Sequence, residues 1–399
     1  MNEKWAGCLK AAFCRLCCRI KPDPKVWIFS STDNRHFNYN SKYLFLYVRG
    51  HLPDIRPRYV INDDAYRADL QKTYGAEYFI ETKSTQGILT VLKAGVWFTS
   101  AGLPVYGTGL SRNRRIVNLW HGIPLKTIAL QDRTQSGLQK LYFRKIFSEN
   151  YTDVVSTSEA VGKVMQAGLG VGADRIRIWG QPRCDCLYYP QDRMEFLERV
   201  YPSSDEIPLP EGLRYLVLYA PTFRTGKSVR LFPFADFDRR KMEEFLKEHG
   251  ILLCIRLHLS EQDGQAFPES AYLRYMNEDR LDDITEGLSA FDLLITDYSS
   301  IYADFLLLNR PMVFLPYDLE EYADAHGFSF PYEAVTPGPK PQNMADFLQC
   351  LSEALPENTG GMGEMRPDRY EADRIRVRDL FHNVQEPCCE RICREILMG

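Results

Sequence analysis

The chain has 399 residues, of which 49 are Lys or Arg and 53 are Asp or Glu, so its formal net charge is -4. This length is enough for two domains, and 45% hydrophobic with 26% charged residues is the composition of an ordinary folded protein. The near balance of charge gives no overall attraction to nucleic acid or to an anionic membrane. We therefore expect no nucleic-acid partner, and a membrane partner would have to meet a local basic patch.

Aliphatic runs in the chain are short. The longest, such as 251–255 and 305–308, fall far below the roughly 20 residues that span a bilayer. We predict no transmembrane helix, and basic residues early in the chain argue against a cleavable signal peptide. The eleven cysteines are an odd number, which favours reduced thiols in a cytoplasm. Cysteines near both ends could meet around zinc, but unliganded thiols are favoured and no metal site is predicted.

Residues 1–22 are predicted to form an amphipathic helix. Apolar side chains recur at steps of three or four, and basic side chains flank them. The apolar stripe holds Trp5, Leu9, Phe13 and Leu16, and the flank holds Lys10, Arg15 and Arg19. This pairing is typical of a helix that lies on an anionic membrane, and it equally suits a helix packed on its own protein.

From residue 26 onward, short apolar runs with β-forming residues alternate with longer helical patterns. After a polar stretch at 201–212 the alternation starts again. The runs are 26–30, 58–61, 96–100, 116–120, 176–179, 215–220, 251–255, 292–296 and 312–315. This rhythm predicts an α/β protein with parallel sheets. We expect an N-terminal Rossmann-like domain at 23–205 and a C-terminal one at 206–399, facing each other across a cleft with ligands at the carboxyl ends of the strands.

Polar side chains directly follow five of these runs. His121 follows 116–120, and His258 stands at the equivalent place in the second half. A histidine can accept a proton from a hydroxyl group or, when protonated, offer charge to a phosphate, although a lone histidine here could also cap a turn. The other candidates for substrate contacts are Gly122, Lys126, Arg183, Asp185, Pro221, Thr222, Arg224, Arg256, Asp297, Ser299, Ser300 and Asp304.

Several of these candidates also have an ordinary structural interpretation. Arg224 and Arg256 lie near strand ends, where a guanidinium would grip a diphosphate, but they could be surface charges. Ser299 and Ser300 stand where a helix begins, which suits both an N-cap and an anion site. The candidate aspartates could simply orient loops. The sequence has no Gly-rich dinucleotide fingerprint and no Walker motif, so phosphate binding would rest on side chains and a helix terminus.

These strand-end segments resemble the signature of the CDP-glycerol glycerophosphotransferase family, bacterial enzymes of teichoic acid synthesis. The resemblance runs from about residue 26 to about 385, with Ile123, Cys184 and Leu259 departing from the usual pattern. The matching segments are His121-Gly122-x-Pro124-Leu125-Lys126, Gly180-x-Pro182-Arg183-x-Asp185, Tyr219-Ala220-Pro221-Thr222-Phe223-Arg224, Arg256-x-His258, and Asp297-Tyr298-Ser299-Ser300 followed by Pro311, Asp318 and Tyr322.

The resemblance implies a GT-B architecture that holds CDP-glycerol mainly in the C-terminal half and the acceptor in the N-terminal half. It implies that His121 is the general base and that His258 lies near the donor phosphates. The side chains of Thr222, Arg224, Ser299 and Ser300 would then offset the diphosphate charge. No cofactor beyond the donor substrate is expected.

Chain length favours the family's primase, which adds glycerol phosphate to an undecaprenyl-diphosphate-linked disaccharide and releases CMP. We therefore expect a peripheral protein on the cytoplasmic face of the bacterial membrane. The alternatives are a poly(glycerol phosphate) polymerase, a ribitol-phosphate transferase, a GT-B sugar-nucleotide glycosyltransferase or epimerase, and a catalytically silent membrane-associated binding protein.

A second candidate for membrane contact lies at 133–147. Lys140, Arg144 and Lys145 alternate there with apolar residues, shortly after the His121 motif. The pattern predicts either a basic amphipathic surface for a lipid substrate or a helix that packs its apolar face on the core.

Overall fold

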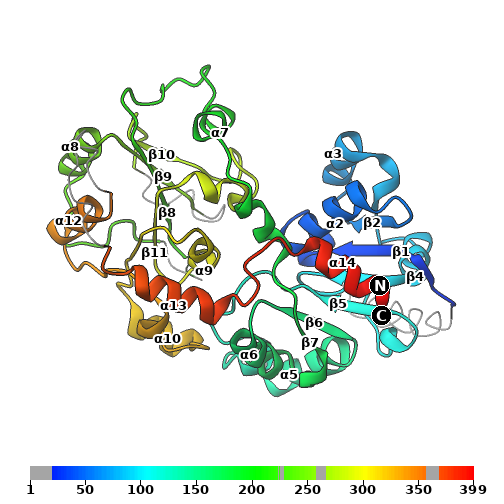
Figure 1. The fold of residues 1–399 in the computed structure, drawn as a ribbon. Helices are drawn as coiled ribbons and strands as arrows, with labels where there is room; N and C mark the ends of the chain where they lie inside the picture. The colour runs from blue at the N-terminus through cyan, green and yellow to red at the C-terminus, as the bar shows by residue number, and fades with distance from the viewer. Residues whose placement is uncertain (1–19, 223, 225–228, 258–266, 356–367) are drawn as a thin grey trace. The chain divides into compact units, whose positions relative to one another are not determined.

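The structure is a computed structural model, and it describes residues 20–222, 224, 229–257, 267–355 and 368–399 (Figure 1). The chain divides into two compact units. Unit 1 comprises Met1–Asp185 with Phe381–Gly399, and unit 2 comprises Cys186–Leu380. Each unit holds a parallel sheet flanked by helices, so the predicted α/β class with parallel sheets is confirmed.

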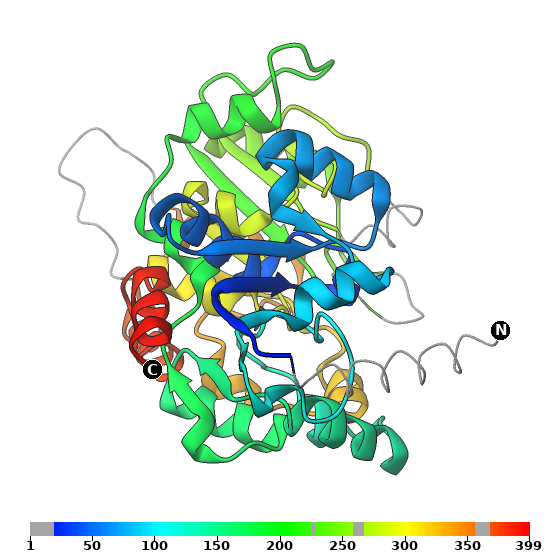
Figure 2. The ribbon, with the colours of Figure 1, turned by 90° about the vertical axis from the view of Figure 1, so that its right-hand side faces the viewer.

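Unit 1 is built on a seven-stranded parallel sheet with the order β3-β2-β1-β4-β5-β6-β7. Figure 2 shows two of its strands, in blue, side by side. The strands are β1 (Asp23–Ser30), β2 (Arg56–Val60), β3 (Phe79–Ile80), β4 (Ala94–Thr99), β5 (Arg115–Asn118), β6 (Asp153–Ser156) and β7 (Ile176–Ile178). Most strand residues are buried, and most of the buried ones are apolar, as expected for a parallel sheet covered on both faces.

The helices of unit 1 follow the strands in the pattern that the sequence predicts. They are α2 (Tyr39–His51), α3 (Asp64–Tyr74), α4 (Thr85–Leu92), α5 (Gly137–Phe143), α6 (Glu159–Leu169) and α14 (Cys389–Met398). Local chemistry sets their ends. In α6, the Ser158 side chain accepts a hydrogen bond from the Val161 backbone N–H, and Gly170 ends the helix in a left-handed conformation with φ of 63°.

Unit 2 is built on a five-stranded parallel sheet with the order β10-β9-β8-β11-β12. Its strands are β8 (Tyr215–Ala220), β9 (Ile251–Ile255), β10 (Leu273–Tyr275), β11 (Leu293–Thr296) and β12 (Met312–Phe314). Its helices are α7 (Arg193–Val200), α8 (Arg239–His249), α9 (Ile301–Phe305), α10 (Leu319–His326), α11 (Tyr332–Val335), α12 (Met344–Ala354) and α13 (Glu371–Phe381). All five residues of β9 are buried, which marks it as a central strand.

The boundary between the units differs from the predicted division at 205/206. It lies after Asp185, and the end of the chain returns to unit 1. There α14 contacts α2, and the Asp185 carboxylate accepts hydrogen bonds from the backbone N–H groups of Cys388 (2.8 Å) and Cys389 (3.0 Å) at the start of α14 (Figure 1). The hydrogen bond between Asp185 and Cys388 joins residues that are 203 positions apart, so no local pattern could have predicted it.

The predicted amphipathic helix at 1–22 falls almost entirely outside the described residues, which begin at Ile20. Within the described part of the chain, no helix combines the length and the apolar character needed to cross a membrane.

Candidate active site

His121 lies just beyond the carboxyl end of β5, and its ring is held on two sides. The ring Nδ1 is 3.0 Å from the Ser100 carbonyl oxygen, which lies just beyond β4. Because a carbonyl oxygen only accepts, Nδ1 carries the hydrogen and donates it. The indole of Trp120 stacks on the imidazole with ring centroids 4.3 Å apart. The neutral ring therefore presents Nε2 as its proton acceptor.

The backbone that carries His121 adopts an unusual conformation. Trp120 has a φ of 57°, in the left-handed region that costs a bulky residue energy. Its N–H donates to the side chain of Asn118 at 2.8 Å. The amide of Asn40, near the start of α2, donates to the carbonyl oxygens of Leu119 (3.0 Å) and Trp120 (2.9 Å). These bonds hold the strained turn and thereby fix the direction of the imidazole.

Asn40 also joins the His121 turn to a second motif. Its side-chain oxygen accepts a hydrogen bond from the Arg183 backbone N–H at 3.1 Å, and its exposed fraction is 0%. The Arg183 guanidinium in turn donates through Nη1 to the His121 carbonyl oxygen at 2.7 Å. The fold therefore brings His121 and Arg183, two of the predicted site residues, into contact through Asn40, which was not among the candidates.

The surroundings of His121 keep its side chain neutral. Burial lowers the pKa of His121 to about 4, and the positive charges of Arg183 and Lys126 add to this decrease, while the hydrogen bond to Ser100 opposes it. Lys126 itself is exposed, and Gly122 is buried. At neutral pH the imidazole is therefore uncharged and ready to accept a proton.

Asp185 has a structural role in addition to its predicted contact with substrate, which stays a prediction. Both of its carboxylate oxygens accept backbone hydrogen bonds at the start of α14. A carboxylate is stabilised there because the first N–H groups of a helix have no partners inside the helix. Asp185 therefore orients a distant segment, the alternative that the sequence left open.

In unit 2, Asp297 organises the loops beyond β8 and β11. It is 2% exposed. One carboxylate oxygen accepts hydrogen bonds from the Thr222 backbone N–H (2.8 Å), the Thr222 hydroxyl (2.6 Å) and the Tyr298 backbone N–H (2.6 Å). Thr222 and Asp297 therefore lie in direct contact, and the aspartate binds protein groups and orients the loops.

Arg224 is the counter-charge of this cluster. Its guanidinium contacts Asp297 at 2.8 Å and Asp318 at 2.8 and 3.0 Å, and donates to the Thr222 carbonyl oxygen at 2.7 Å. The rings of Tyr298 and Tyr322 lie within 5.1 Å of its central carbon. The structure gives Arg224 a role in holding the buried Asp297 and the partly buried Asp318, and its predicted contact with a diphosphate stays a prediction.

Arg256 is also committed to the protein. Its guanidinium donates to the carbonyl oxygens of Met276 (3.1 Å) and Asp282 (3.0 Å), and also to that of Leu281. Burial lowers the pKa of Arg256, and nearby carboxylates oppose this decrease. The side chain therefore ties the end of β9 to the segment after β10, and its predicted diphosphate contact stays a prediction.

The remaining candidates of unit 2 lie around the start of α9. Ser299 and Ser300 are half-buried, and the Ser299 hydroxyl is 3.5 Å from the Ile301 backbone N–H, a distant cap. Pro221 is also half-buried, whereas Asp304 is 1% exposed. His258 lies outside the described residues, so its predicted place near the donor phosphates stays a prediction.

Cysteines show no metal site in the part of the chain that the structure describes. No group of three or more His, Cys, Asp or Glu residues there could hold a metal ion. Cys388, Cys389 and Cys393 are buried beside α2 and carry free thiols, and burial raises the pKa of Cys393 to about 12. The cysteines before Ile20 lie outside the described residues.

Sequence reasoning missed the residues that position the others. Asn40 and Ser100 support His121, and neither was among the candidates. Asp318 and Tyr298 complete the cluster around Arg224; both stand among the motif residues named from the sequence, but no role was predicted for them. Asn40 and Ser100 both stand in segments that follow strands of the predicted sheet. Extending the search for polar residues to the β1 and β4 ends would have found them.

The comparison with family models decides where the chain belongs. The model described as "CDP-Glycerol:Poly(glycerophosphate) glycerophosphotransferase" matches residues 12–397. The chain belongs to this family. The match covers nearly the whole sequence, including every motif that carries the resemblance.

Curated relatives in this family are teichoic acid enzymes. The chain is 25% identical to the teichoic acid glycerol-phosphate transferase of Staphylococcus aureus (strain NCTC 8325), over 83% of this chain and 84% of the relative. It is 27% identical to the teichoic acid poly(glycerol phosphate) polymerase of Bacillus subtilis (strain 168), over 84% of this chain and 44% of the relative. It is 29% identical to the teichoic acid poly(ribitol-phosphate) polymerase of Bacillus spizizenii, over 62% of this chain and 39% of the relative. The chain thus spans less than half the length of these two polymerases.

Solved structures show the same fold. A variant of the wall teichoic acid polymerase TagF superposes with a TM-score of 0.75 at 20% identity, covering 98% of this chain and 92% of that chain. The UDP-GlcNAc 2-epimerase of Neisseria meningitidis gives a TM-score of 0.51 at 11% identity, covering 94% of this chain and 99% of that chain. The fold of this family member is therefore much closer to TagF than to this epimerase.

Proposed function

We propose that the chain transfers glycerol phosphate from CDP-glycerol to an undecaprenyl-diphosphate-linked disaccharide and releases CMP, as a primase does. In this proposal unit 2 binds the donor and unit 1 binds the acceptor. The family match over 12–397 supports the transfer. The choice of a primase is supported by the teichoic acid glycerol-phosphate primase of Bacillus spizizenii, to which the chain is 28% identical over 56% of this chain and 56% of that relative.

The tautomer of His121 is the observation that carries the proposed chemistry. Since Nδ1 donates to the Ser100 carbonyl oxygen, the lone pair of Nε2 accepts the proton of the acceptor hydroxyl. The hydroxyl oxygen attacks the β-phosphorus of CDP-glycerol, and the bond from this phosphorus to the bridging oxygen breaks. The bridging oxygen leaves on CMP, and the proton stays on His121.

Arg183 and Lys126 link the base to an anionic acceptor in this proposal. Their positive charges help to keep the pKa of His121 low in the free protein. A lipid diphosphate bound beside them would offset these charges, so the pKa of His121 would rise as the acceptor binds. Binding would thereby strengthen the base at the moment it is needed. A structure of a TagF variant soaked with CDPG, with a TM-score of 0.74, supports the choice of donor.

We further propose that α5 places the protein on an anionic membrane. Leu138, Leu141 and Tyr142 are 81%, 53% and 54% exposed, which is unusual for three large apolar side chains on one short helix. Arg144 and Lys145 are exposed beside them, and Lys140 is half-buried. Exposed apolar side chains with basic neighbours suit the interface of an anionic bilayer. Sedimentation with phosphatidylglycerol vesicles should decrease several-fold on Leu138→Ser/Leu141→Ser substitution, and unchanged sedimentation would contradict this proposal.

The transfer is tested by incubating the full chain with CDP-glycerol and a synthetic lipid-linked disaccharide. The number of glycerol phosphates on each product is counted by mass spectrometry, with CDP-ribitol and UDP-sugars as alternative donors. One addition from CDP-glycerol is the expected result, and it should survive EDTA because we propose that no metal cofactor is needed. Long products would favour a polymerase. Absence of CMP release from CDP-glycerol, with turnover of another donor, would overturn the proposal.

A further inference from the structure

We propose a second anion-binding site in unit 1, at the edge of the sheet opposite His121, that takes a phosphate ester. A cavity of about 620 Å³ opens at the amino ends of β1, β4, β5, β6 and β7. In a parallel sheet all carboxyl ends share the other edge, where His121 lies, so this cavity is separate from the proposed catalytic centre. Four arginines line it, namely Arg112, Arg114, Arg115 and Arg177.

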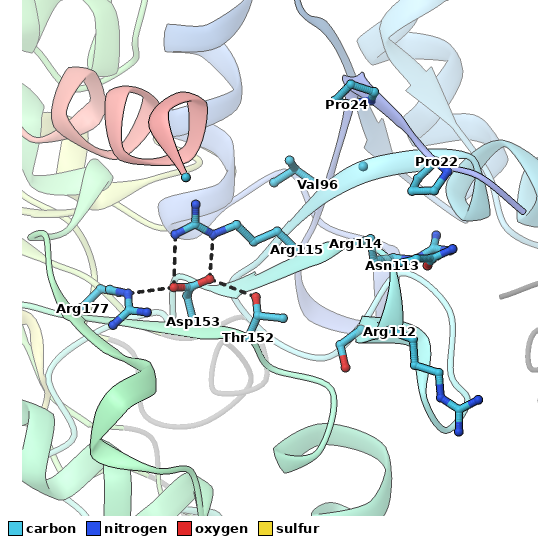
Figure 3. Close-up of a pocket in the computed structure, with 13 residues that line it drawn as sticks. Pro22, Pro24, Val96, Arg112, Asn113, Arg114, Arg115, Thr152, Asp153 and Arg177 are labelled. Carbon is cyan, nitrogen blue, oxygen red and sulfur yellow. Dashed lines mark hydrogen bonds and ion pairs between the residues drawn. The ribbon is translucent and has the colours of Figure 1, made fainter. Parts of the chain in front are cut away.

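A charged triad forms one wall of the cavity. Asp153, at the start of β6, accepts hydrogen bonds from Nε of Arg115 and Nε of Arg177, both at 2.8 Å, and from the Thr152 hydroxyl at 2.9 Å (Figure 3). The carboxylate is 4% exposed, whereas the side chains of Arg115 and Arg177 are 23% and 35% exposed. The negative charge is thus hidden behind two cations that remain partly open to solvent.

The triad carries a net positive charge at neutral pH. Burial alone would raise the pKa of Asp153, but the bonds and charges of Arg115, the Thr152 hydroxyl and the charge of Arg177 lower it overall. One ionised carboxylate therefore faces two guanidinium groups. Even if a carboxylate at Gly399, which also lines the cavity, is counted, the four arginines outnumber the acidic groups two to one.

Hydrogen-bond donors remain for a ligand. The Nη1 atom of Arg177 donates to the Asp174 carbonyl oxygen at 2.7 Å, and its Nη2 makes no hydrogen bond among the described residues. Arg112 is exposed on another part of the wall (Figure 3). Arg114 is different, because it is 6% exposed and donates to backbone carbonyl oxygens, so it supports the wall. All three nitrogens of the Arg115 guanidinium donate to protein groups, namely Nε and Nη2 to Asp153 and Nη1 to the Glu395 carbonyl oxygen, so this side chain contributes its charge. Arg112 and Arg177 are therefore the groups that can reach an anion.

The size and charge of the cavity select the class of ligand. About 620 Å³ lies within the range of roughly 300–1,000 Å³ typical of small-molecule sites. The planar guanidinium fork matches the oxygens of a phosphate with two parallel hydrogen bonds. A neighbouring cavity of about 340 Å³ extends the positive field. It is lined by four basic residues, Lys21, Arg56, Arg58 and Lys93, and by one acidic residue, Asp23. A phosphate ester fits these features, whether it is a phospholipid headgroup or a free phosphate compound.

Arginine-specific modification of the full-length wild-type chain tests the site directly. Phenylglyoxal labelling is mapped by mass spectrometry, without ligand, with inorganic pyrophosphate, and with vesicles of phosphatidylglycerol or of neutral phosphatidylcholine. We expect selective protection of Arg112 and Arg177, while the exposed Arg240 of unit 2 stays reactive. Protection by pyrophosphate identifies a free-phosphate site, and protection by phosphatidylglycerol vesicles alone identifies a lipid headgroup site. If Arg112, Arg177 and Arg240 were labelled equally in every condition, the proposal would be overturned.

A matched pair of variants gives a second measure. The double variant Arg112→Ala/Arg177→Ala should bind inorganic pyrophosphate or phosphatidylglycerol vesicles, whichever protects the wild type, about tenfold more weakly, because charge-assisted hydrogen bonds are lost. Lys72→Ala/Arg240→Ala removes the same charge from exposed positions and should bind as the wild type does. Release of CMP with the lipid acceptor in detergent should be equal in the wild type and in both double variants, since none of the substituted residues belongs to the proposed catalytic centre. Equal affinity in both variants would contradict the site. Each variant's melting temperature verifies that it is folded.

Discussion

The two clusters of polar residues at strand ends use their charges in opposite ways. In unit 1 the His121 ring is held by a backbone carbonyl and by stacking, which leaves Nε2 as its proton acceptor. In unit 2 the charges of Arg224, Asp297 and Asp318 are bound to one another. Residues of the same family signature therefore serve two tasks, because some present reactive atoms and others hold the loops that surround them.

The difference follows from the cost of burying charge. A histidine can be buried as a neutral group, so the site around His121 tolerates a low pKa without a counter-ion. A buried carboxylate needs a cation and hydrogen bonds. Burial lowers the pKa of Arg224, but Asp318 and Asp297 raise it overall, so the guanidinium keeps its charge. Its substitution should consequently act on folding before it acts on chemistry.

The largest expected effect is on stability, from Arg224→Met. This change leaves the buried Asp297 and the partly buried Asp318 without their cation, so the free energy of unfolding should fall by about 3–5 kcal/mol in urea titrations. The control Arg240→Met removes an exposed guanidinium and should change stability by less than about 0.5 kcal/mol. A stable Arg224→Met protein that had lost affinity for CDP-glycerol would instead make Arg224 a diphosphate ligand and remove the contrast between the clusters.

Asn40→Asp tests whether the turn of His121 is positioned by a side chain. The substitution keeps the shape but removes the two hydrogen bonds donated to Leu119 and Trp120, and adds a negative charge near His121. We expect kcat to fall by about 10- to 100-fold with a smaller change in KM, and the acid limb of the pH profile to move to higher pH. Asn62→Asp, at a different loop of the same unit, is the matched control. A fall in stability with an unchanged kcat and pH profile would show that Asn40 is only structural.

A smaller effect concerns the pH dependence of folding. The pKa of His121 is about 4 in the folded protein and about 6.5 when unfolded, so the unfolded chain binds more protons between these values. Stability should therefore fall as pH decreases from 6.5 to 4. The decrease in the free energy of unfolding that His121 causes should be about 1–2 kcal/mol, after allowance for solvent screening at the partly exposed ring. His121→Asn should lack this decrease. Parallel urea titrations across this range measure it, and identical pH curves for both proteins would contradict the low pKa.

The sequence predicted the elements well because their signals are local. Alternating apolar runs located most of the strands, and the position of His121 followed from the end of one run. It could not predict which charges would be paired, because the partners are distant in the chain. Arg224 meets Asp318 across 94 residues, and Asp185 meets the start of α14 across 203. A charged residue at a strand end therefore marks the correct edge of the sheet, but only the fold shows whether its charge is already satisfied.

The most direct test of the proposed mechanism is CMP release by His121→Asn. Asparagine can still donate a hydrogen bond to the Ser100 carbonyl oxygen, but it cannot accept a proton as imidazole does. With CDP-glycerol and the lipid-linked disaccharide, we predict that kcat falls by about 10²- to 10⁴-fold while the affinity for CDP-glycerol is unchanged. Near wild-type release of CMP by this variant, with both substrates bound, would contradict the role of His121 as the general base.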